Sequence, residues 1–169
     1  MISEEHRKAL RTLHDALADL ESPWAITGSL GFALHGMNVP ASDIDLQTDR
    51  EGAYKIENAF RQHVVKSVAF SEGNGIRSHF GELRICGVKV EIMGDVQKRL
   101  PTGEWESPVE VREHRTFVDF DGMQLPVLSL EYEEKAYRIL GRTDKANLIR
   151  EWLTRPLERT RASARVAQF

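Results

Sequence analysis

Residues 24–46 read WAITGSLGFALHGMNVPASDIDL, which is the most informative stretch of the chain. Its first four residues predict a short apolar strand that ends at Gly28-Ser29, and a second strand opens with Asp43 and Asp45 on either side of an isoleucine. Because successive side chains on a strand point to opposite faces, the two aspartates share one face while the isoleucine enters the core. Hard oxygen ligands of this kind suit Mg²⁺, which is typically held by one or two carboxylates together with substrate phosphates. The pair therefore predicts a divalent cation site.

The dipeptide Gly28-Ser29 lies where the first strand ends. A tight turn into a helix at this point aims backbone N–H groups and the serine hydroxyl outward, which is a common way of binding phosphate. Taken alone, a Gly-Ser or an Asp-x-Asp is more often a plain turn or a solvated strand end. Here the two occur in order, with 13 residues between Ser29 and Asp43. The combination predicts a phosphate-binding turn followed by a metal site.

This order of elements resembles the signature of the DNA polymerase β-like nucleotidyltransferase superfamily, which includes minimal nucleotidyltransferases, antibiotic-modifying adenylyltransferases and tRNA-terminal transferases. The resemblance covers roughly residues 20–155. It implies an α/β (α+β) fold, in which a mixed β-sheet is flanked by helices and followed by a short C-terminal helical extension. We expect a nucleotidyltransferase core at residues 1–128, a helical extension packed on the core at 129–155 and a basic tail at 156–169.

The superfamily pattern requires a third carboxylate on a later strand, and Glu91 is the candidate. Residues 88–93 read VKVEIM, so the apolar residues face the core while Glu91 faces outward. Taken alone, this position is equally typical of an ordinary solvent-facing glutamate. Asp95, just past Gly94, is a second candidate that could replace or assist Glu91. The resemblance leaves open whether Glu91 acts as a metal ligand or as a general base.

The resemblance implies an enzyme that transfers a nucleoside monophosphate, with AMP expected, from an NTP to an acceptor hydroxyl or phosphate and releases pyrophosphate. Two Mg²⁺ or Mn²⁺ ions can hold the attacking and leaving oxygens of such a reaction in line. In this scheme Asp43 and Asp45 bind the metals, while Glu91 helps to hold the second metal and could accept the proton of the acceptor. Gly28 and Ser29 would bind the β- and γ-phosphates of the nucleotide.

The segment from residue 129 onward is similar to the C-terminal segment of small bacterial nucleotidyltransferases. Its pattern predicts a helix over 129–140, a break at Gly141 and a second helix over 144–153. The resemblance implies that Lys135 contacts the triphosphate, but the i, i+4 spacing would equally pair it with Glu131 on the surface. Four further basic side chains could also neutralise triphosphate charge, although each is typical of a solvated surface: Arg77, His79, Arg84 and Lys89.

Composition restricts the choice of acceptor and compartment. The 169 residues carry a net charge of −3, which argues against a dedicated nucleic-acid binder. Among the acceptors that the resemblance allows, a small molecule or a protein therefore fits better than a tRNA. The single cysteine, Cys86, excludes an internal disulfide framework. No apolar run approaches the length of a membrane span, so we expect no membrane partner and a cytoplasmic protein.

Hydrophobic periodicity and turn residues predict the remaining elements. The predicted elements are a helix over 3–20, a helix over 52–63, a strand over 64–70, a loop over 71–77 and a hairpin over 78–93. Asp121-Gly122 predicts a second hairpin, and Pro126 predicts that the second strand of this hairpin lies at a sheet edge.

Two functions of different classes are compatible with these residues. The first is the metal-dependent nucleotidyltransferase described above. The second is a catalytically silent nucleotidyltransferase fold that acts as a binding protein or a toxin–antitoxin component. The set Asp43, Asp45 and Glu91 favours the enzyme, because a silent copy has no physical need to keep mutually repelling carboxylates together. The chain is short for a separate acceptor domain, so a homodimer could complete the site across subunits.

Overall fold

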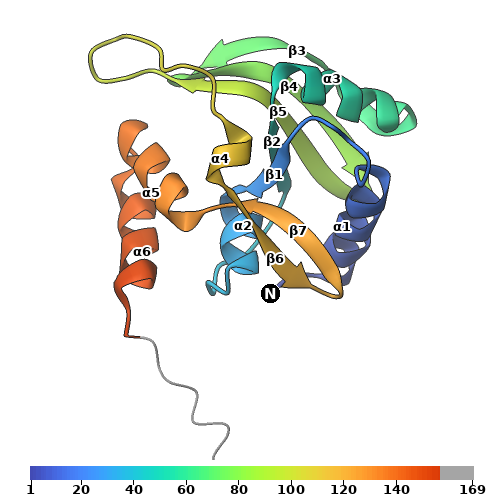
Figure 1. Cartoon of the computed structure of the whole chain (residues 1–169), viewed down its shortest axis with the longest axis horizontal. Coiled ribbons are helices and arrows are strands. Elements are labelled where there is room, and N and C mark those ends of the chain that lie inside the picture. The colour runs from blue at the N-terminus through green and yellow to red at the C-terminus, as the bar shows by residue number, and fades with distance from the viewer. Residues whose placement is uncertain (157–169) are drawn as a thin grey trace, which may run out of the picture.

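Strands β1 (Trp24–Thr27) and β2 (Ile44–Thr48) form an antiparallel pair at the centre of the protein (Figure 1). The computed structural model describes residues 1–156. Within these residues the sheet is completed by β3 (Val64–Gly73), β4 (Ile76–Ile85), β5 (Val88–Lys98), β6 (Arg115–Phe120) and β7 (Met123–Leu128). The strand order is β3-β4-β5-β2-β1-β7-β6, with β2 parallel to β5 and β1 parallel to β7. This mixed sheet confirms the predicted fold class.

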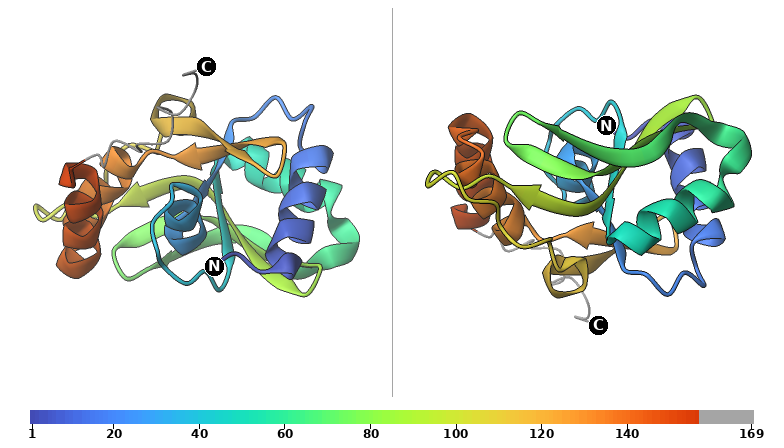
Figure 2. Two further views of the ribbon diagram at one scale, coloured as in Figure 1. Left: turned by 90° about the horizontal axis from the view of Figure 1, so that it is seen from below. Right: turned by 90° about the horizontal axis from the view of Figure 1, so that it is seen from above.

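Helices lie on both sides of the sheet, with α1 and α3 on one side and α5 and α6 on the other (Figures 1 and 2). Their bounds, with one 3₁₀ turn, are α1 (Glu4–Ala16), α2 (Gly28–Leu34), α3 (Arg50–Ala59), η1 (Arg61–His63), α4 (Val111–His114), α5 (Leu130–Ile139) and α6 (Thr143–Thr154). Side-chain oxygens of Ser3, Asp49 and Ser129 accept backbone N–H groups at the starts of α1, α3 and α5. These caps set where the three helices begin. No helix within residues 1–156 is long and apolar enough to span a membrane.

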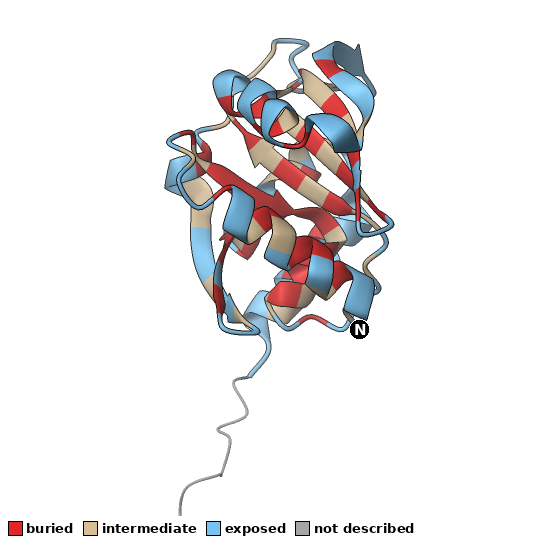
Figure 3. Ribbon diagram, turned by 90° about the vertical axis from the view of Figure 1, so that its right-hand side faces the viewer, coloured by how far each residue is buried: buried red, intermediate tan, exposed pale blue. Residues whose placement is uncertain are grey.

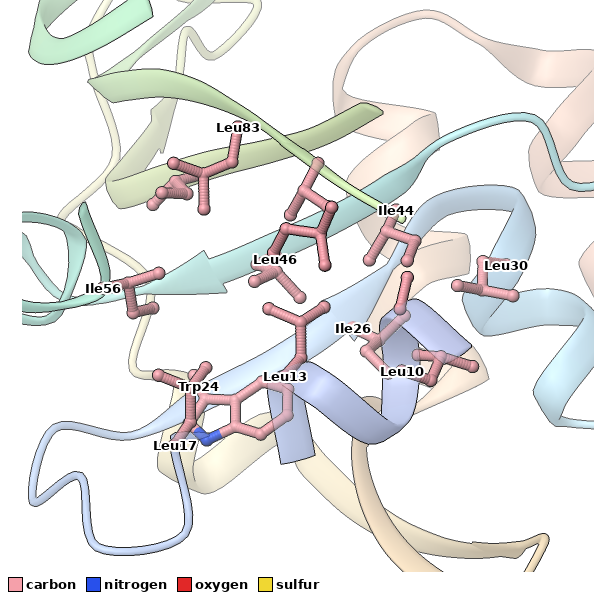
Figure 4. Packing of buried hydrophobic residues seen from close by; sticks show 14 of the residues in the cluster. Leu10, Leu13, Leu17, Trp24, Ile26, Leu30, Ile44, Leu46, Ile56 and Leu83 are labelled. Atoms are coloured by element: carbon pink, nitrogen blue, oxygen red, sulfur yellow. The ribbon is translucent and has the colours of Figure 1, made fainter. Parts of the chain in front are cut away.

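The main core lies between α1, α3 and one face of the sheet (Figures 3 and 4). The leucine stripe of α1, including Leu10 and Leu13, packs against Ile26 and Leu46 of the central strands. Each such side chain contributes about 2 kcal/mol on burial. Because Ile44 and Leu46 point into this core, Asp45 between them on β2 must face the other side of the sheet. The hydrophobic pattern thereby fixes the face on which the aspartates lie.

A second cluster joins the C-terminal helices to α2. The rings of Phe32 in α2 and Tyr137 in α5 meet edge to face with their centroids 5.9 Å apart, and Ile149 of α6 is fully buried beside them. The predicted extension at 129–155 corresponds to α5 and α6, although its division from the core at residue 128 stays a prediction. Of the predicted basic tail, residues 157–169 lie outside the described part of the chain.

Two local predictions are wrong. Residues 71–77 are not a loop, because β3 and β4 extend through them and turn tightly at Asn74-Gly75, where both residues have positive φ. Pro126 does not mark an edge, since β7 lies between β1 and β6. Proline is tolerated there because β7 pairs with β1 only at Ile26 and Val127. The hairpins predicted over 78–93 and at Asp121-Gly122 are confirmed, and the first of them turns at Cys86-Gly87.

Candidate active site

Neighbouring strands bring the predicted carboxylates together on the face opposite α1. Asp45 of β2 is directly in register with Glu91 of β5, so both side chains project from the same face. Asp43 immediately precedes β2. The Lys89 ammonium lies between the two outer acids, 3.0 Å from Asp43 Oδ2 and 2.9 Å from Glu91 Oε1. The three acids chosen from the sequence therefore form one cluster with Lys89 at its centre.

This cluster concentrates negative charge. Burial first, and then the neighbouring Glu91 and Asp43, together raise the pKa of Asp45 to about 7, and Lys89 compensates only in part. Hydrogen bonds from the Lys89 ammonium to Glu91 and Asp43 raise the pKa of that lysine, which keeps it charged. The negative charge of the three acids thus exceeds the single positive charge that Lys89 supplies to them.

The donor set of this cluster fits a divalent cation. Within residues 1–156, no three His, Cys, Asp or Glu side chains are arranged as a closed metal-ligand set. In this cluster, the Lys89 ammonium lies between Asp43 and Glu91. The ligands are nevertheless hard carboxylate oxygens, and the raised pKa of Asp45 indicates an anion that lacks sufficient cationic charge. A divalent ion taking the place of the ammonium would supply that charge.

Gly28 lies against these acids at the start of α2. Its φ is +70°, and a Cβ built on it would lie 2.6 Å from Asp45 Oδ2, so both the backbone and the space require glycine. On its other side, the Gly28 N–H donates to Glu133 Oε1 over 3.3 Å, and the Thr27 hydroxyl donates to the same oxygen. The Gly28 N–H that was expected to bind phosphate is therefore engaged by Glu133 of α5. Nothing in the sequence near Glu133 indicated this contact.

Glu133 is a buried acid that binds the turn, with 4 % of its surface exposed. Burial raises its pKa to about 7, and the hydrogen bonds from Thr27 and Gly28 oppose that rise. Its position predicts a specific pH dependence. Between its ordinary pKa of 4.5 and about 7, the folded protein holds a proton that the unfolded chain releases. The free energy of unfolding therefore falls as the pH rises through this interval.

Glu133→Gln is expected to remove this part of the pH dependence. Glutamine can accept the same two hydrogen bonds but carries no charge, so the variant should match the wild type near pH 4 and exceed it by about 3 kcal/mol near pH 8. Urea unfolding of both proteins at the two pH values measures the difference. A difference of the same size at both pH values would contradict the account.

A cavity of about 270 Å³ lies between the acidic face of the sheet and α5. Its walls include Asp45 and Glu91 on the sheet side and Glu133 on the helix side. The other lining residues are Thr27, Gly28, Gln47, Ile76, Met93, Val96, Lys98, Tyr132, Ala136, Tyr137, Leu140 and Arg142. Asp45 and Glu91 thus face a space that a ligand can occupy, whereas Asp43 does not line it.

A β-bulge brings Lys98 into this cavity. At Asp95, whose φ is +50°, β5 carries one extra residue relative to β4, because Arg77 pairs with Gln97 while His79 pairs with Gly94. The extra residue reverses the alternation, so Glu91 and Met93 line the cavity before the bulge and Val96 and Lys98 line it afterwards. Strict alternation in the sequence would have placed Lys98 with the core residues.

The remaining predicted residues lie apart from the cavity walls. Asp95, the alternative third acid, accepts the Arg50 N–H at the start of α3 over 3.0 Å and does not line the cavity. Ser29 is half-buried in the first turn of α2. Lys135 is exposed on α5, next to the lining residue Ala136. A cation that the sequence did not single out, Arg142, lines the cavity instead.

Comparison with solved structures agrees with this arrangement. A protein from Thermotoga maritima assigned as a nucleotidyltransferase is 53% identical over 90% of this chain and 95% of its own, with a TM-score of 0.80. The antibiotic-resistance factor ANT(2'')-Ia has a TM-score of 0.57 at 13% identity, covering 86% of this chain and 82% of its own. The lincosamide antibiotic adenylyltransferase LnuA, solved with lincomycin bound, has a TM-score of 0.54 at 14% identity and covers 88% of this chain and 98% of its own. The last two likenesses show the fold alone.

Comparison at the level of sequence gives a narrower result. No curated protein matches the chain significantly. The family model for aminoglycoside-2''-adenylyltransferases matches residues 9–151, which include every element from β1 to α5 and all the acids described above. The chain therefore belongs to the aminoglycoside-2''-adenylyltransferase family of nucleotidyltransferases.

Proposed function

We propose that the protein transfers a nucleoside monophosphate, most simply AMP, from an NTP to an acceptor hydroxyl or phosphate with release of pyrophosphate. The observation that supports this most directly is the in-register pair Asp45 and Glu91 at the wall of a cavity that also includes Gly28. Bound Mg²⁺ or Mn²⁺ would supply charge stabilisation at the phosphorus and at the leaving pyrophosphate. Asp43, Asp45 and Glu91 are the residues that would hold it.

The chain's own residues account for the remaining steps of this proposal. The acceptor oxygen forms a bond to the α-phosphorus, the bond from that phosphorus to the pyrophosphate oxygen breaks, and Glu91 takes the acceptor's proton. Gly28 and Ser29 lie at the start of α2, where backbone N–H groups favour an anion. For the Gly28 N–H to bind phosphate, Glu133 must release it.

Two cations of the C-terminal segment are proposed contacts for the triphosphate. Arg142 lines the cavity, and among the described residues its guanidinium has no carboxylate partner. Lys135 is exposed on α5 beside the cavity wall and stays a proposed contact. Both are separated from the acids along the sequence, yet the fold brings their segment over the acidic face of the sheet.

A small molecule is the proposed acceptor. The net charge of −3 disfavours a polynucleotide, and a structure with the same fold, LnuA, was solved with an antibiotic bound. The expected homodimer stays a prediction, which sedimentation of the full chain would test.

Calorimetry of the full chain with each of the four NTPs tests the proposed function. We expect at least one NTP to bind when Mg²⁺ is present and to bind much more weakly when it is chelated. Failure of every NTP to bind with metal would favour the catalytically silent alternative, in which the fold serves as a binding or toxin–antitoxin component.

Arg142→Ala is expected to weaken binding of the preferred NTP about tenfold, because it removes a charged contact to phosphate. The same measurement on Lys135→Ala decides whether the exposed lysine also contributes. Equal affinity of Arg142→Ala and the wild type would exclude Arg142 as a triphosphate contact. Circular dichroism of each variant controls for loss of folding.

A further inference from the structure

The cavity has two chemically different ends. Along β5 it extends from Glu91, past the bulge at Asp95, to Lys98. At about 3.3 Å per residue, the backbone positions of these ends are on the order of 20 Å apart. The Glu91 end carries the acids that suit a metal and phosphates, and the Lys98 end contains the only buried ammonium of the described chain. A ligand that reaches both ends must present different groups to each.

Lys98 has a hydrogen-bond donor to spare. Its side chain is 4% exposed, and its ammonium lies 2.9 Å from Glu106 Oε2 and donates to Tyr132 Oη over 3.1 Å. An ammonium has three N–H donors, and among residues 1–156 these two are its hydrogen-bonding and ion-pair partners. A buried donor without an acceptor is unfavourable by about 1 to 3 kcal/mol. A ligand atom in the adjoining cavity can provide the third acceptor.

The surroundings of Lys98 favour a flat, uncharged acceptor over a phosphate. Glu106 already offsets the lysine charge, and the neighbouring lining residues Val96 and Ile76 are apolar. The multiple charges of a triphosphate would need cations that are not already paired. A heteroaromatic ring offers carbonyl or ring-nitrogen acceptors at little desolvation cost, and the apolar side chains at this end of the cavity can pack against it.

Gln47 provides an independent observation in the same cavity. It follows Asp45 by two residues on β2 and lines the cavity on the same face of the sheet. Its Oε1 is buried and has no hydrogen-bond partner within the described residues. A buried carbonyl oxygen without a donor is unfavourable, and a ligand N–H that reached this oxygen would satisfy it. The cavity therefore offers a donor at Lys98 and a polar amide at Gln47.

We infer that Lys98 is a specificity-determining residue, which donates a hydrogen bond to the base of the donor nucleotide and thereby helps to select among NTPs. The nucleotide lies with its phosphates at the acids and its base in the cavity beside Lys98, whose third N–H reaches an acceptor of the base. The bulge at Asp95 turns the Lys98 side chain toward the cavity. This inference rests on the proposed function, because it takes the ligand of the cavity to be an NTP.

Calorimetry with two kinds of probe tests the inference. The four NTPs and inorganic tripolyphosphate, each with Mg²⁺, are titrated into the full-length wild type and into Lys98→Met. We expect Lys98→Met to bind the preferred NTP about tenfold more weakly, to bind the four NTPs with nearly equal affinity and to bind tripolyphosphate like the wild type. Lys55→Met, which removes an exposed lysine paired with Glu51 on α3, should change none of these affinities.

Each other outcome has a definite meaning. Equal weakening of tripolyphosphate would make Lys98 a phosphate contact and overturn the inference, as would unchanged NTP affinities or a wild type that binds all four NTPs equally. If the wild type binds no NTP, the proposed function fails instead. Because Lys98→Met leaves Glu106 without its partner, the double variant Lys98→Met with Glu106→Gln serves if the single variant does not fold. The same shifts are expected of it.

Discussion

Asp45→Asn is expected to lose at least about a hundredfold of nucleotidyl transfer while resisting unfolding at least as well as the wild type. Asp45 lies between the two other parts of the proposed site. It is in register with Glu91, the proposed base, and it lies against Gly28 of the proposed phosphate-binding turn. Asparagine keeps the shape of the side chain but removes the charge that would bind a divalent ion. Pyrophosphate release in the presence of NTP, Mg²⁺ and an acceptor with a free hydroxyl measures the activity.

The stability of Asp45→Asn separates this account from a structural role. The charge of Asp45 is opposed by burial and by Glu91, so its removal should raise the melting temperature near pH 8 by several degrees. Mg²⁺ should raise the melting temperature of the wild type but not that of the variant. A variant that is both inactive and much less stable would instead indicate that Asp45 mainly maintains the fold.

Asp95→Asn is the matched control for this experiment. Asparagine can still accept the Arg50 N–H through its carbonyl oxygen, and the residue does not line the cavity. We expect its activity to stay within about twofold of the wild type, in keeping with the small effect of substitutions away from a site. A large loss would instead identify Asp95 as the third catalytic acid in place of Glu91.

Gly28→Ala is expected to reduce nucleotidyl transfer nearly as much as Asp45→Asn does. An alanine Cβ would lie 2.6 Å from Asp45 Oδ2, so the carboxylate must move, and φ of +70° adds about 1 kcal/mol of backbone strain. The turn that positions the start of α2 would move with it. Activity should fall at least about a hundredfold, because misplacement of reacting groups by about 1 Å is sufficient for such a loss.

Gly141→Ala isolates the backbone part of this effect. Gly141 has nearly the same φ, +72°, but a Cβ there meets nothing within 4 Å. It should therefore lose about 1 kcal/mol of stability and keep its activity. Chemical denaturation and pyrophosphate release on both variants give the comparison. Similar activities for Gly28→Ala and Gly141→Ala would mean that the contact with Asp45 is unimportant.

The sequence was sufficient to predict features that depend on local pattern. Alternation on β2 and β5 placed Asp45 and Glu91 on one face, and the parallel pairing of the two strands brings these residues side by side. The same alternation failed at the Asp95 bulge, because one inserted residue reverses the face of every later side chain on the strand. The sequence pattern therefore did not predict that Lys98 lines the cavity.

Local sequence patterns could not predict contacts between segments that are far apart in the sequence. Glu133 reads as one of several acids on an amphipathic helix, and only the packing of α5 places it against Thr27 and Gly28, more than 100 residues earlier. Arg142 lies in a segment that the resemblance had emphasised, but the burial of its neighbour Tyr137 against Phe32 determines where that segment lies. Lys135 was chosen from the resemblance of its segment, which does not distinguish the cavity side of the helix from its exposed side.

The placement of Lys89 has a consequence for ion selectivity. Its ammonium already gives Asp43 and Glu91 one positive charge at hydrogen-bonding distance. A sodium or potassium ion would bring no more charge than the lysine it displaced, and it would also have to lose its own hydration. Only an ion of higher charge gains by the exchange. At the proposed metal site, the lysine would therefore disfavour monovalent ions and still permit exchange for a divalent ion.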